Sequence, residues 1–250
     1  QLQARGLQPG QKPELAALEM PEVLTAIHTD YANAGADILL ANTFGANAKK
    51  LTGCGHTVEE VVSASIACAR KAAETTGACV ALDIGPLGEL LVPAGTLAFE
   101  DAYNEFAQVI RAGAAAGADL VFLETMTDLY ELKAAILAAR ENCDLPVFTS
   151  MSFESRGRTF TGCTVESYAV TAAGLGADAV GLNCSSGPDQ MGTVVRMMKK
   201  AAPDTPIAAK PNAGLPTITE TGEAVYHMNP EDFARHMHAL KADGASLLGG

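Results

Sequence analysis

The 250-residue sequence has no tryptophan, and aromatic residues make up only 5% of it. Basic residues are also scarce, since 17 lysines and arginines stand against 29 aspartates and glutamates, for a formal net charge of −12. Nucleic acids and anionic membrane surfaces attract clusters of positive charge, so this balance argues against both as partners. No apolar run approaches the ~18 residues of a membrane-spanning helix, and no signal peptide is recognisable. We therefore expect no nucleic-acid and no membrane partner.

The six cysteines lack the dense, regular spacing of a small secreted domain stabilised by disulfides. Hydrophobic residues make up 48% of the chain, which is enough for a large core without such bridges. We expect reduced thiols in a cytoplasmic protein. Cys68, in a predicted helix, and Cys79, in a predicted strand, fit the ordinary use of cysteine as a small buried residue.

One junction recurs along the chain: a helical segment, then Gly-Ala, then a short β-rich run. The Gly-Ala pairs begin at Gly35, Gly77, Gly117, Gly176 and Gly244, and the runs "VFTSMSF" and "IAAKPNAG" follow a proline instead. Glycine adopts the left-handed conformation that ends a helix, and proline cannot continue one. Seven junctions, roughly 30–40 residues apart, predict an α/β fold of the (β/α)8 TIM-barrel class.

The first predicted strand of this repeat is preceded by a helical segment, residues 21–34, which implies an earlier strand. Residues 1–20 contain no β-rich run, and the sequence stops at Gly249-Gly250. We therefore expect one truncated barrel domain over residues 1–250, without strand 1 and without the segment after strand 8. An open doubly wound sheet is the alternative, but the Gly-x-Gly-x-x-Gly turn and a change of rhythm at a switch point are absent from the sequence.

Two helix starts are marked by capping residues. Thr57 and Glu60 have the spacing of a capping box. Asn229 followed by Pro230 is typical of an N-cap with proline at the first helical position. Helices are therefore expected to begin just after Thr57 and Asn229.

Polar side chains stand at the ends of the predicted strands, and in a parallel barrel these ends meet at one mouth. They are Asn42, Thr43, Asp83, Glu124, Thr125, Ser150, Ser152, Asn183, Cys184, Ser185, Lys210 and Asn212. Several polar residues in this part of the strands and loops, such as Thr125, Ser152 and Ser186, could simply cap the next helix. Their convergence nevertheless predicts a polar, thiol-bearing site at the mouth.

Cys184 is the most informative of these residues, because it follows an apolar run and precedes the loop "SSGP". This position suits a metal ligand or a nucleophile. A nucleophilic cysteine normally has a histidine base nearby, and the five histidines fall on helices or distal loops. A zinc site needs at least three protein ligands. Cys54 and Cys163 lie in loops on the same side and could contribute, although neither has partners at ligand spacing.

Three charged residues offer further chemistry. Glu124 ends an apolar strand, where a carboxylate either caps a helix or holds a cationic group such as an amine. Asp83 precedes the tight loop "IGPLG", where ligand contact and turn capping are both open. Lys210 ends the run "PIAAK", and a lysine in this position can form a Schiff base, which would indicate an aldolase-like lyase.

Five motifs taken in order resemble one family. They are "GADILLANTFGAN", "DIGPLGELL", "FLETMTDLYELKAA", "GLNCSSGPDQM" and "KPNAGLP". Together they resemble the homocysteine S-methyltransferase family, and within it the homocysteine-binding domain of cobalamin-dependent methionine synthase. The resemblance covers essentially the whole chain.

The resemblance implies a (β/α)8 barrel with a catalytic zinc held by three cysteines. One of these maps onto Cys184, and the other two form a Gly-Gly-Cys-Cys-Gly motif that is expected just beyond Gly250. The family's opening Asp-Gly-Ala-Met-Gly-Thr motif, on strand one, is also absent. By the same resemblance, Glu124 holds the homocysteine amino group, Asn183 and Asp83 line the substrate pocket, and Asn42 supports it.

The implied reaction is transfer of a methyl group to the thiol of homocysteine, which gives methionine. Zinc would deprotonate the thiol, since a free thiol has a pKa near ~8.5 and is mostly protonated at neutral pH. The donor would be methylcobalamin, recharged from 5-methyltetrahydrofolate, so cobalamin-binding and folate-binding domains of a parent chain are the expected partners. Methyl transfer from S-methylmethionine or betaine is the alternative. A Schiff-base lyase using Lys210 and an inactive, homocysteine-binding fragment remain open, and we expect the 250 residues alone to be inactive.

Overall fold

The computed structural model describes residues 1–154, 157–184, 187–214, 217–218, 224–225 and 228–250. The chain divides into two compact units, Gln1–Leu123 with Ala134–Val147, and Glu124–Lys133 with Phe148–Gly250. Strand β3 (Leu120–Met126) and helix α6 (Leu129–Asn142) each contribute residues to both units. The loop residues Ser185 and Ser186 lie outside the described residues.

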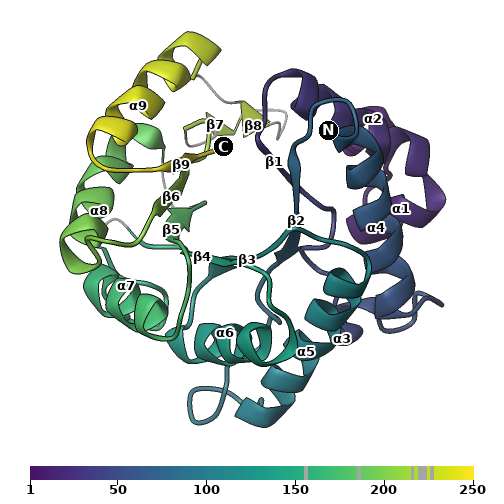
Figure 1. Cartoon of the computed structure of the whole chain (residues 1–250), viewed down its shortest axis with the longest axis horizontal. Coiled ribbons are helices and arrows are strands. Elements are labelled where there is room, and N and C mark those ends of the chain that lie inside the picture. The colour runs from purple at the N-terminus through teal and green to yellow at the C-terminus, as the bar shows by residue number, and fades with distance from the viewer. Residues whose placement is uncertain (155–156, 185–186, 215–216, 219–223, 226–227) are drawn as a thin grey trace. The chain divides into compact units, whose positions relative to one another are not determined.

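The first unit is built on parallel strands that follow one another in chain order (Figure 1). β1 (Ile38–Leu40) pairs with β2 (Cys79–Ile84), and β2 pairs with the first part of β3. Its helical segments are η1 (Gln3–Arg5), η2 (Pro13–Leu15), α1 (Ala16–Glu19), α2 (Pro21–Asn33), α3 (Ala48–Leu51), α4 (Val58–Ala73) and α5 (Phe99–Ala115). Helix α4 packs against both α2 and α5.

Strand β2 shows why the apolar runs are so uninterrupted. Val80, Ala81 and Leu82 are fully buried, as in a strand covered on both faces. Helix α5 approaches β2 closely at Gly113, where a Cβ atom would lie 2.4 Å from a methyl group of Leu82. A glycine inside this helix therefore lets the helix and the strand come into direct contact.

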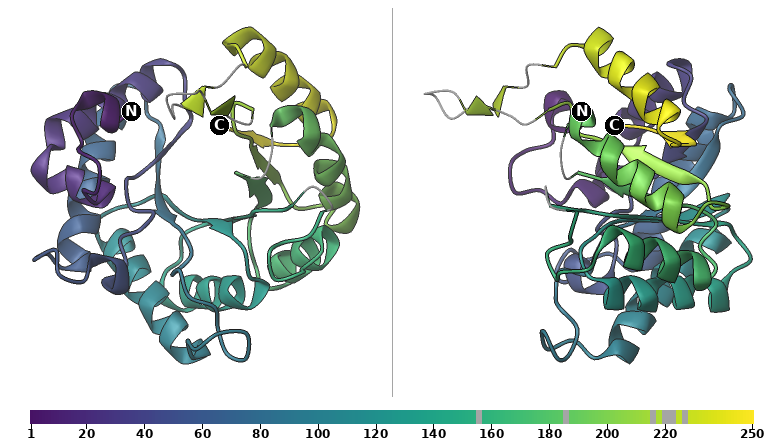
Figure 2. Two further views of the ribbon diagram at one scale, coloured as in Figure 1. Left: turned by 180° about the vertical axis from the view of Figure 1, so that it is seen from behind. Right: turned by 90° about the vertical axis from the view of Figure 1, so that its left-hand side faces the viewer.

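The second unit continues the same pattern with β4 (Val147–Met151), β5 (Val180–Asn183), β6 (Ile207–Lys210) and β9 (Leu247–Leu248), which pair in parallel in chain order. Helices α7 (Val165–Gly174), α8 (Pro188–Ala201) and α9 (Pro230–Ala242) alternate with these strands. The short antiparallel pair β7 (Thr217–Ile218) and β8 (Ala224–Val225) extends away from β5 and β6 (Figure 2, right).

The seven predicted β-rich runs are all strands, and all of them are parallel to their neighbours within each unit. The five junction glycines all have positive φ, between 73° and 114°, as the helix-ending interpretation requires. The sequential strand order within each unit lacks the reversal of a doubly wound sheet. The absence of a first barrel strand stays a prediction.

The predicted helix starts are confirmed. Thr57 accepts a hydrogen bond from the backbone N–H of Glu60, whose carboxylate in turn accepts from Thr57 N–H. Asn229 caps α9, with Pro230 at its first position. None of the helices in the described residues has the length and apolar character to cross a bilayer.

The two cysteines predicted to be core residues differ. Cys68 is buried on α4, as expected. Cys79 is exposed, because it is the first residue of β2 and stands at the start of the strand rather than in its buried body. The expectation for Cys79 was therefore wrong.

Candidate functional site

Two charged side chains in the second unit, Glu124 and Lys210, form an ion pair. The Lys210 ammonium at the end of β6 donates a hydrogen bond to Oε2 of Glu124 on β3. The two side chains are only 20% and 12% exposed, respectively. Charged groups this far removed from water are stable when they are paired, so the geometry shows that this carboxylate accepts a cationic amine.

Asn183, the last residue of β5, organises the neighbouring strand ends. Its side-chain oxygen accepts hydrogen bonds from Thr125 N–H at 3.1 Å and from the Ser150 hydroxyl at 2.9 Å. Its side-chain nitrogen donates to the Thr125 hydroxyl oxygen at 2.7 Å. The Ser152 hydroxyl donates to the Asn183 carbonyl at 3.2 Å. One buried amide therefore connects the ends of β3, β4 and β5.

The backbone on either side of this network is unusual. Thr125 and Cys184 have φ values of 60° and 58°, the left-handed region that residues other than glycine seldom adopt. Cys184 N–H donates to Lys210 carbonyl oxygen at 3.4 Å, and the Asn212 side chain donates to the Cys184 carbonyl at 3.2 Å. Non-glycine residues are held in this region only when their surroundings fix them, and such residues cluster at functional sites.

The Cys184 thiol is exposed, in agreement with a position at a strand end rather than in the core. Asn183 is paired with Lys210 in the β5–β6 register, so the thiol and the ammonium come from adjacent positions on neighbouring strands. The predicted residues Glu124, Asn183, Cys184 and Lys210 are thus brought together in the second unit.

The remaining predicted residues lie in the first unit. Asp83 is buried, and its N–H and carbonyl both bond to the hydroxyl of Thr43, at 3.1 and 2.8 Å. The Asn42 side chain donates to the Pro13 carbonyl at 2.6 Å, which ties the N-terminal segment to the end of β1. The backbone position of Asp83 is therefore fixed from the neighbouring strand end.

The cysteines do not assemble a metal centre among the described residues. No three His, Cys, Asp or Glu side chains converge there with the spacing of a metal site. Cys54 contacts the His56 carbonyl, and Cys163 contacts the Thr164 carbonyl. Burial, reinforced by the Asp128 carboxylate, raises the pKa of the Cys163 thiol and disfavours the thiolate that a metal needs. The structure therefore does not support Cys54 and Cys163 as partners of Cys184.

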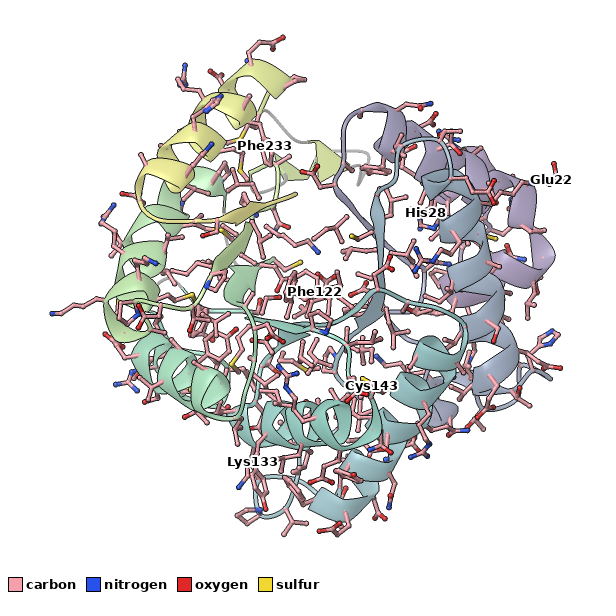
Figure 3. All side chains as sticks on the ribbon, viewed as in Figure 1. Glu22, His28, Phe122, Lys133, Cys143 and Phe233 are labelled. Carbon is pink, nitrogen blue, oxygen red and sulfur yellow. The ribbon has the colours of Figure 1, made fainter. Side chains whose placement is uncertain are left out.

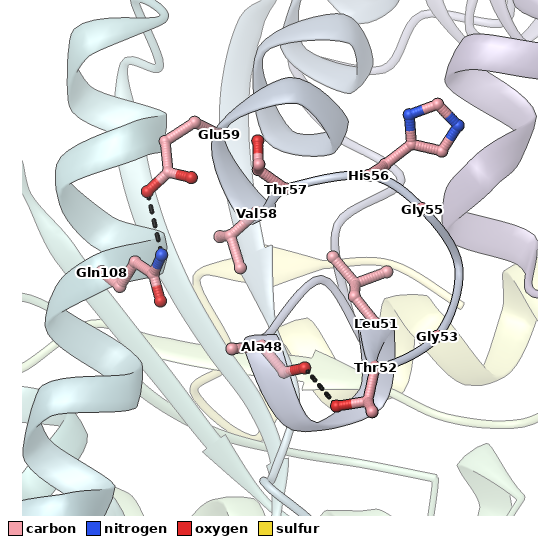
Figure 4. A pocket seen from close by; sticks show the side chains of 10 residues that line it. All are labelled: Ala48, Leu51, Thr52, Gly53, Gly55, His56, Thr57, Val58, Glu59 and Gln108. Carbon is pink, nitrogen blue, oxygen red and sulfur yellow. Dashed lines mark hydrogen bonds between the residues drawn. The ribbon is translucent and has the colours of Figure 1, made fainter.

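A hollow of about 430 Å³ lies elsewhere in the first unit, beside the N-terminus of α4 (Figure 4). Its walls are Ala48, Leu51, Thr52, Gly53, Gly55, His56, Thr57, Val58, Glu59 and Gln108. Glu59 accepts a hydrogen bond from Gln108 there, at 2.9 Å. None of the residues predicted for the site lines this hollow.

One residue that sequence reasoning missed, Tyr168, links two strands of the site. The Tyr168 hydroxyl on α7 donates to the Thr149 carbonyl at 3.0 Å and accepts from Gly181 N–H at 2.9 Å. Tyr168 is completely buried, and burial raises the pKa of its hydroxyl, so the group stays protonated. It fixes β4 to β5 just before Asn183. A lone tyrosine in a predicted helix gave no signal of this contact.

Comparison with known proteins places this site in context. A family model described as homocysteine S-methyltransferase matches residues 1–250. Two curated relatives are the methionine synthases of Mycobacterium tuberculosis (strain ATCC 25618 / H37Rv) and Mycobacterium leprae (strain TN). They are 33% and 34% identical to this chain, respectively, and each match covers 92% of it. The chain spans about a fifth of their length, since it covers 20% of each.

Solved structures show the same fold. The homocysteine methyltransferase MmuM from Escherichia coli matches the whole chain in its oxidized form with a TM-score of 0.82, and in its metallated form with 0.81. In both cases the sequence identity is 21% and 87% of the MmuM chain is covered. The parallel α/β architecture is therefore shared with that enzyme. With the family model matching from the first residue to the last, this chain belongs to the homocysteine S-methyltransferase family.

Proposed function

We propose that this chain binds homocysteine and serves the transfer of a methyl group to its thiol, giving methionine. Membership of the family over residues 1–250 carries the proposal. Support comes from the second unit, which gathers a carboxylate, an ammonium and an exposed thiol at strand ends.

Glu124 is the proposed acceptor for the homocysteine amino group. Its carboxylate is nearly buried and already accepts an N–H of an ammonium in the structure. A substrate ammonium makes the same charge-assisted hydrogen bond. Asn183 is proposed to line the substrate pocket. The roles that the resemblance implies for Asp83 and Asn42, which lie in the first unit, stay predictions.

The described residues alone do not fit a complete zinc site, since zinc needs at least three protein ligands and Cys184 supplies one thiolate. We propose Cys184 as one ligand, with two further cysteines contributed from outside these 250 residues. Its exposed thiol at a strand end is available for this role.

The methyl donor is proposed to be methylcobalamin, regenerated from 5-methyltetrahydrofolate by cobalamin-binding and folate-binding domains of a longer cytoplasmic protein. Support comes from the two mycobacterial relatives, which are named methionine synthases and have about five times the length of this chain. The alternative donors are S-methylmethionine and betaine.

The Schiff-base alternative gains no support from the geometry. The structure holds the Lys210 side chain in an ion pair with the Glu124 carboxylate, whereas Schiff-base formation needs a neutral amine as the nucleophile. Borohydride reduction that trapped a carbonyl substrate on Lys210 would revive this alternative.

The test is to assay the complete natural protein for conversion of homocysteine to methionine with each of the three donors. A Cys184→Ser variant is expected to lose at least a hundredfold in activity, together with bound zinc, because serine is a poor zinc ligand. Cys79→Ser is the matched control. Cys79 is also exposed, but it is the first residue of β2, far from Cys184 in the sequence.

Full activity and full zinc content in the Cys184→Ser variant would overturn the proposal. Homocysteine binding by the 250 residues alone, without turnover by any donor, would favour the inactive-fragment alternative. The three donors also separate the branches of the family.

A further inference from the structure

The Glu124–Lys210 ion pair consists of two groups, each of which can bind a ligand group of opposite charge. A carboxylate has two oxygens with about four acceptor sites, and an ammonium has three N–H donors. One donor of Lys210 and one oxygen of Glu124 meet in their internal bond, and most of each side chain is shielded from water. A ligand with a carboxylate and an ammonium presents the same two kinds of group, so it can replace each partner of this pair without leaving a charge unpaired.

The stem of Lys210 is guided by the neighbouring strand β9. A Cβ atom on Gly249 would lie 3.2 Å from Cγ of Lys210 and 3.7 Å from its Cδ and Cε. Gly249 N–H donates to the Ala209 carbonyl at 3.1 Å, which fixes this approach. Because Gly249 has no side chain, the lysine stem passes close along β9 and its ammonium reaches Glu124.

Homocysteine carries two opposite charges on its α-carbon and a thiol two methylene groups away. Lys210 and Glu124 present the two complementary charges, and Cys184 directly follows Asn183, the partner of Lys210 in the β5–β6 register. A ligand that brought only one charge would leave the other protein charge buried and unpaired, which is costly. A zwitterion satisfies both.

We propose that Lys210 binds the α-carboxylate of the substrate while Glu124 binds its α-ammonium, so that the internal ion pair is exchanged for two ion pairs with the ligand. This inference rests on the proposed function and assigns Lys210 as the residue that makes the site specific for α-amino acids. No covalent bond forms in this step.

The test is calorimetric titration of the complete natural protein with three thiols. They are L-homocysteine, 3-aminopropane-1-thiol, which lacks the carboxylate, and 4-mercaptobutanoate, which lacks the amine. Lys210→Met keeps the stem and removes the charge. It is expected to weaken homocysteine and 4-mercaptobutanoate by at least tenfold, and to leave 3-aminopropane-1-thiol unchanged or tighter.

Two further variants separate charge from structure. Lys210→Arg keeps the charge and is expected to retain the preference for homocysteine over the amine-only thiol. Gly249→Ala keeps both charges but crowds the lysine stem, so it is expected to reduce that preference. Lys200→Met, on the exposed face of α8, is the control and is expected to change nothing.

The outcomes are distinct. Wild-type protein that binds none of the three thiols overturns the proposed function and this inference with it. Wild-type protein that binds homocysteine, with Lys210→Met weakening all three thiols equally or none of them, overturns the inference alone. A selective loss confined to the two carboxylate-bearing thiols supports it.

Discussion

Asn183 is the residue on which the candidate site depends most. Its buried side chain is hydrogen-bonded to Thr125 through both its oxygen and its nitrogen, and it accepts a hydrogen bond from the Ser150 hydroxyl. Asn183→Ala leaves the Thr125 N–H without its acceptor, and an unsatisfied buried group costs about 1–3 kcal/mol. We expect the variant to lose about 2–3 kcal/mol of unfolding free energy in urea.

Asn104→Ala is the matched control for this substitution, because Asn104 is exposed on α5. Its unfolding free energy is expected to stay within about 0.5 kcal/mol of wild type. Equal losses in the two variants would show that the amide network contributes nothing specific.

His28 governs a different property, the pH dependence of stability. It lies on α2, only 6% exposed, and its Nε2 atom has no hydrogen-bond partner in the described part of the chain (Figure 3). Burial lowers the pKa of His28 from 6.5 to about 4. Between these values the unfolded chain binds the proton and the folded chain does not, so stability is present above pH 6.5 and is lost as the pH falls toward 4.

We expect the free energy of unfolding to drop by up to about 3 kcal/mol between pH 6.5 and pH 4 through this residue. Urea titrations at several pH values should show a smaller drop for His28→Leu than for wild type. His238→Leu, at an exposed position on α9, should keep the wild-type slope. Identical slopes in wild type and His28→Leu would contradict the assignment.

The close packing of helix α5 against strand β2 is expected to contribute to stability. At Gly113 a Cβ atom would lie 2.4 Å from Leu82, so Gly113→Ala must push the helix away from the strand. Overpacking of this kind costs about 1–3 kcal/mol, more than the 0.5–1 kcal/mol that alanine gains over glycine within a helix. We expect a net loss of about 1–2 kcal/mol, measured by thermal unfolding.

Gly174→Ala offers the matched comparison, because no heavy atom lies within 4 Å of a Cβ atom at that position in α7. It should be neutral or stabilising by up to about 1 kcal/mol. A destabilisation equal to that of Gly113→Ala would refute the packing argument.

The seven parallel strands were predictable from the sequence because two independent signals mark each of them. A left-handed glycine or a proline ends the preceding helix, and an apolar run follows because the strand is buried. The pairing of Glu124 with Lys210 was not predictable, since 86 residues separate them and only the packing of strand ends brings them together. The positive φ of Thr125 left no trace either, because threonine disfavours it.

At the scale of the whole molecule, the fold narrows the chemistry but does not choose the methyl donor. MmuM shares the architecture of this chain, which covers 87% of it, whereas the methionine synthases match this chain in sequence over 20% of their length. The residues assigned here are proposed to hold the acceptor, homocysteine. We therefore expect the donor to be decided by protein segments outside these residues, and the three-donor assay tests this directly.

The left-handed turn at Thr125 has a consequence for how many groups one strand can supply. Consecutive side chains of a regular strand point to opposite faces, so a strand offers every second residue to a site. Here Glu124 contacts Lys210 while Thr125 contacts Asn183, and those two partners stand side by side in the β5–β6 register. Reversing the sign of φ at one residue thus breaks the alternation and doubles the density of functional groups that β3 delivers to one place.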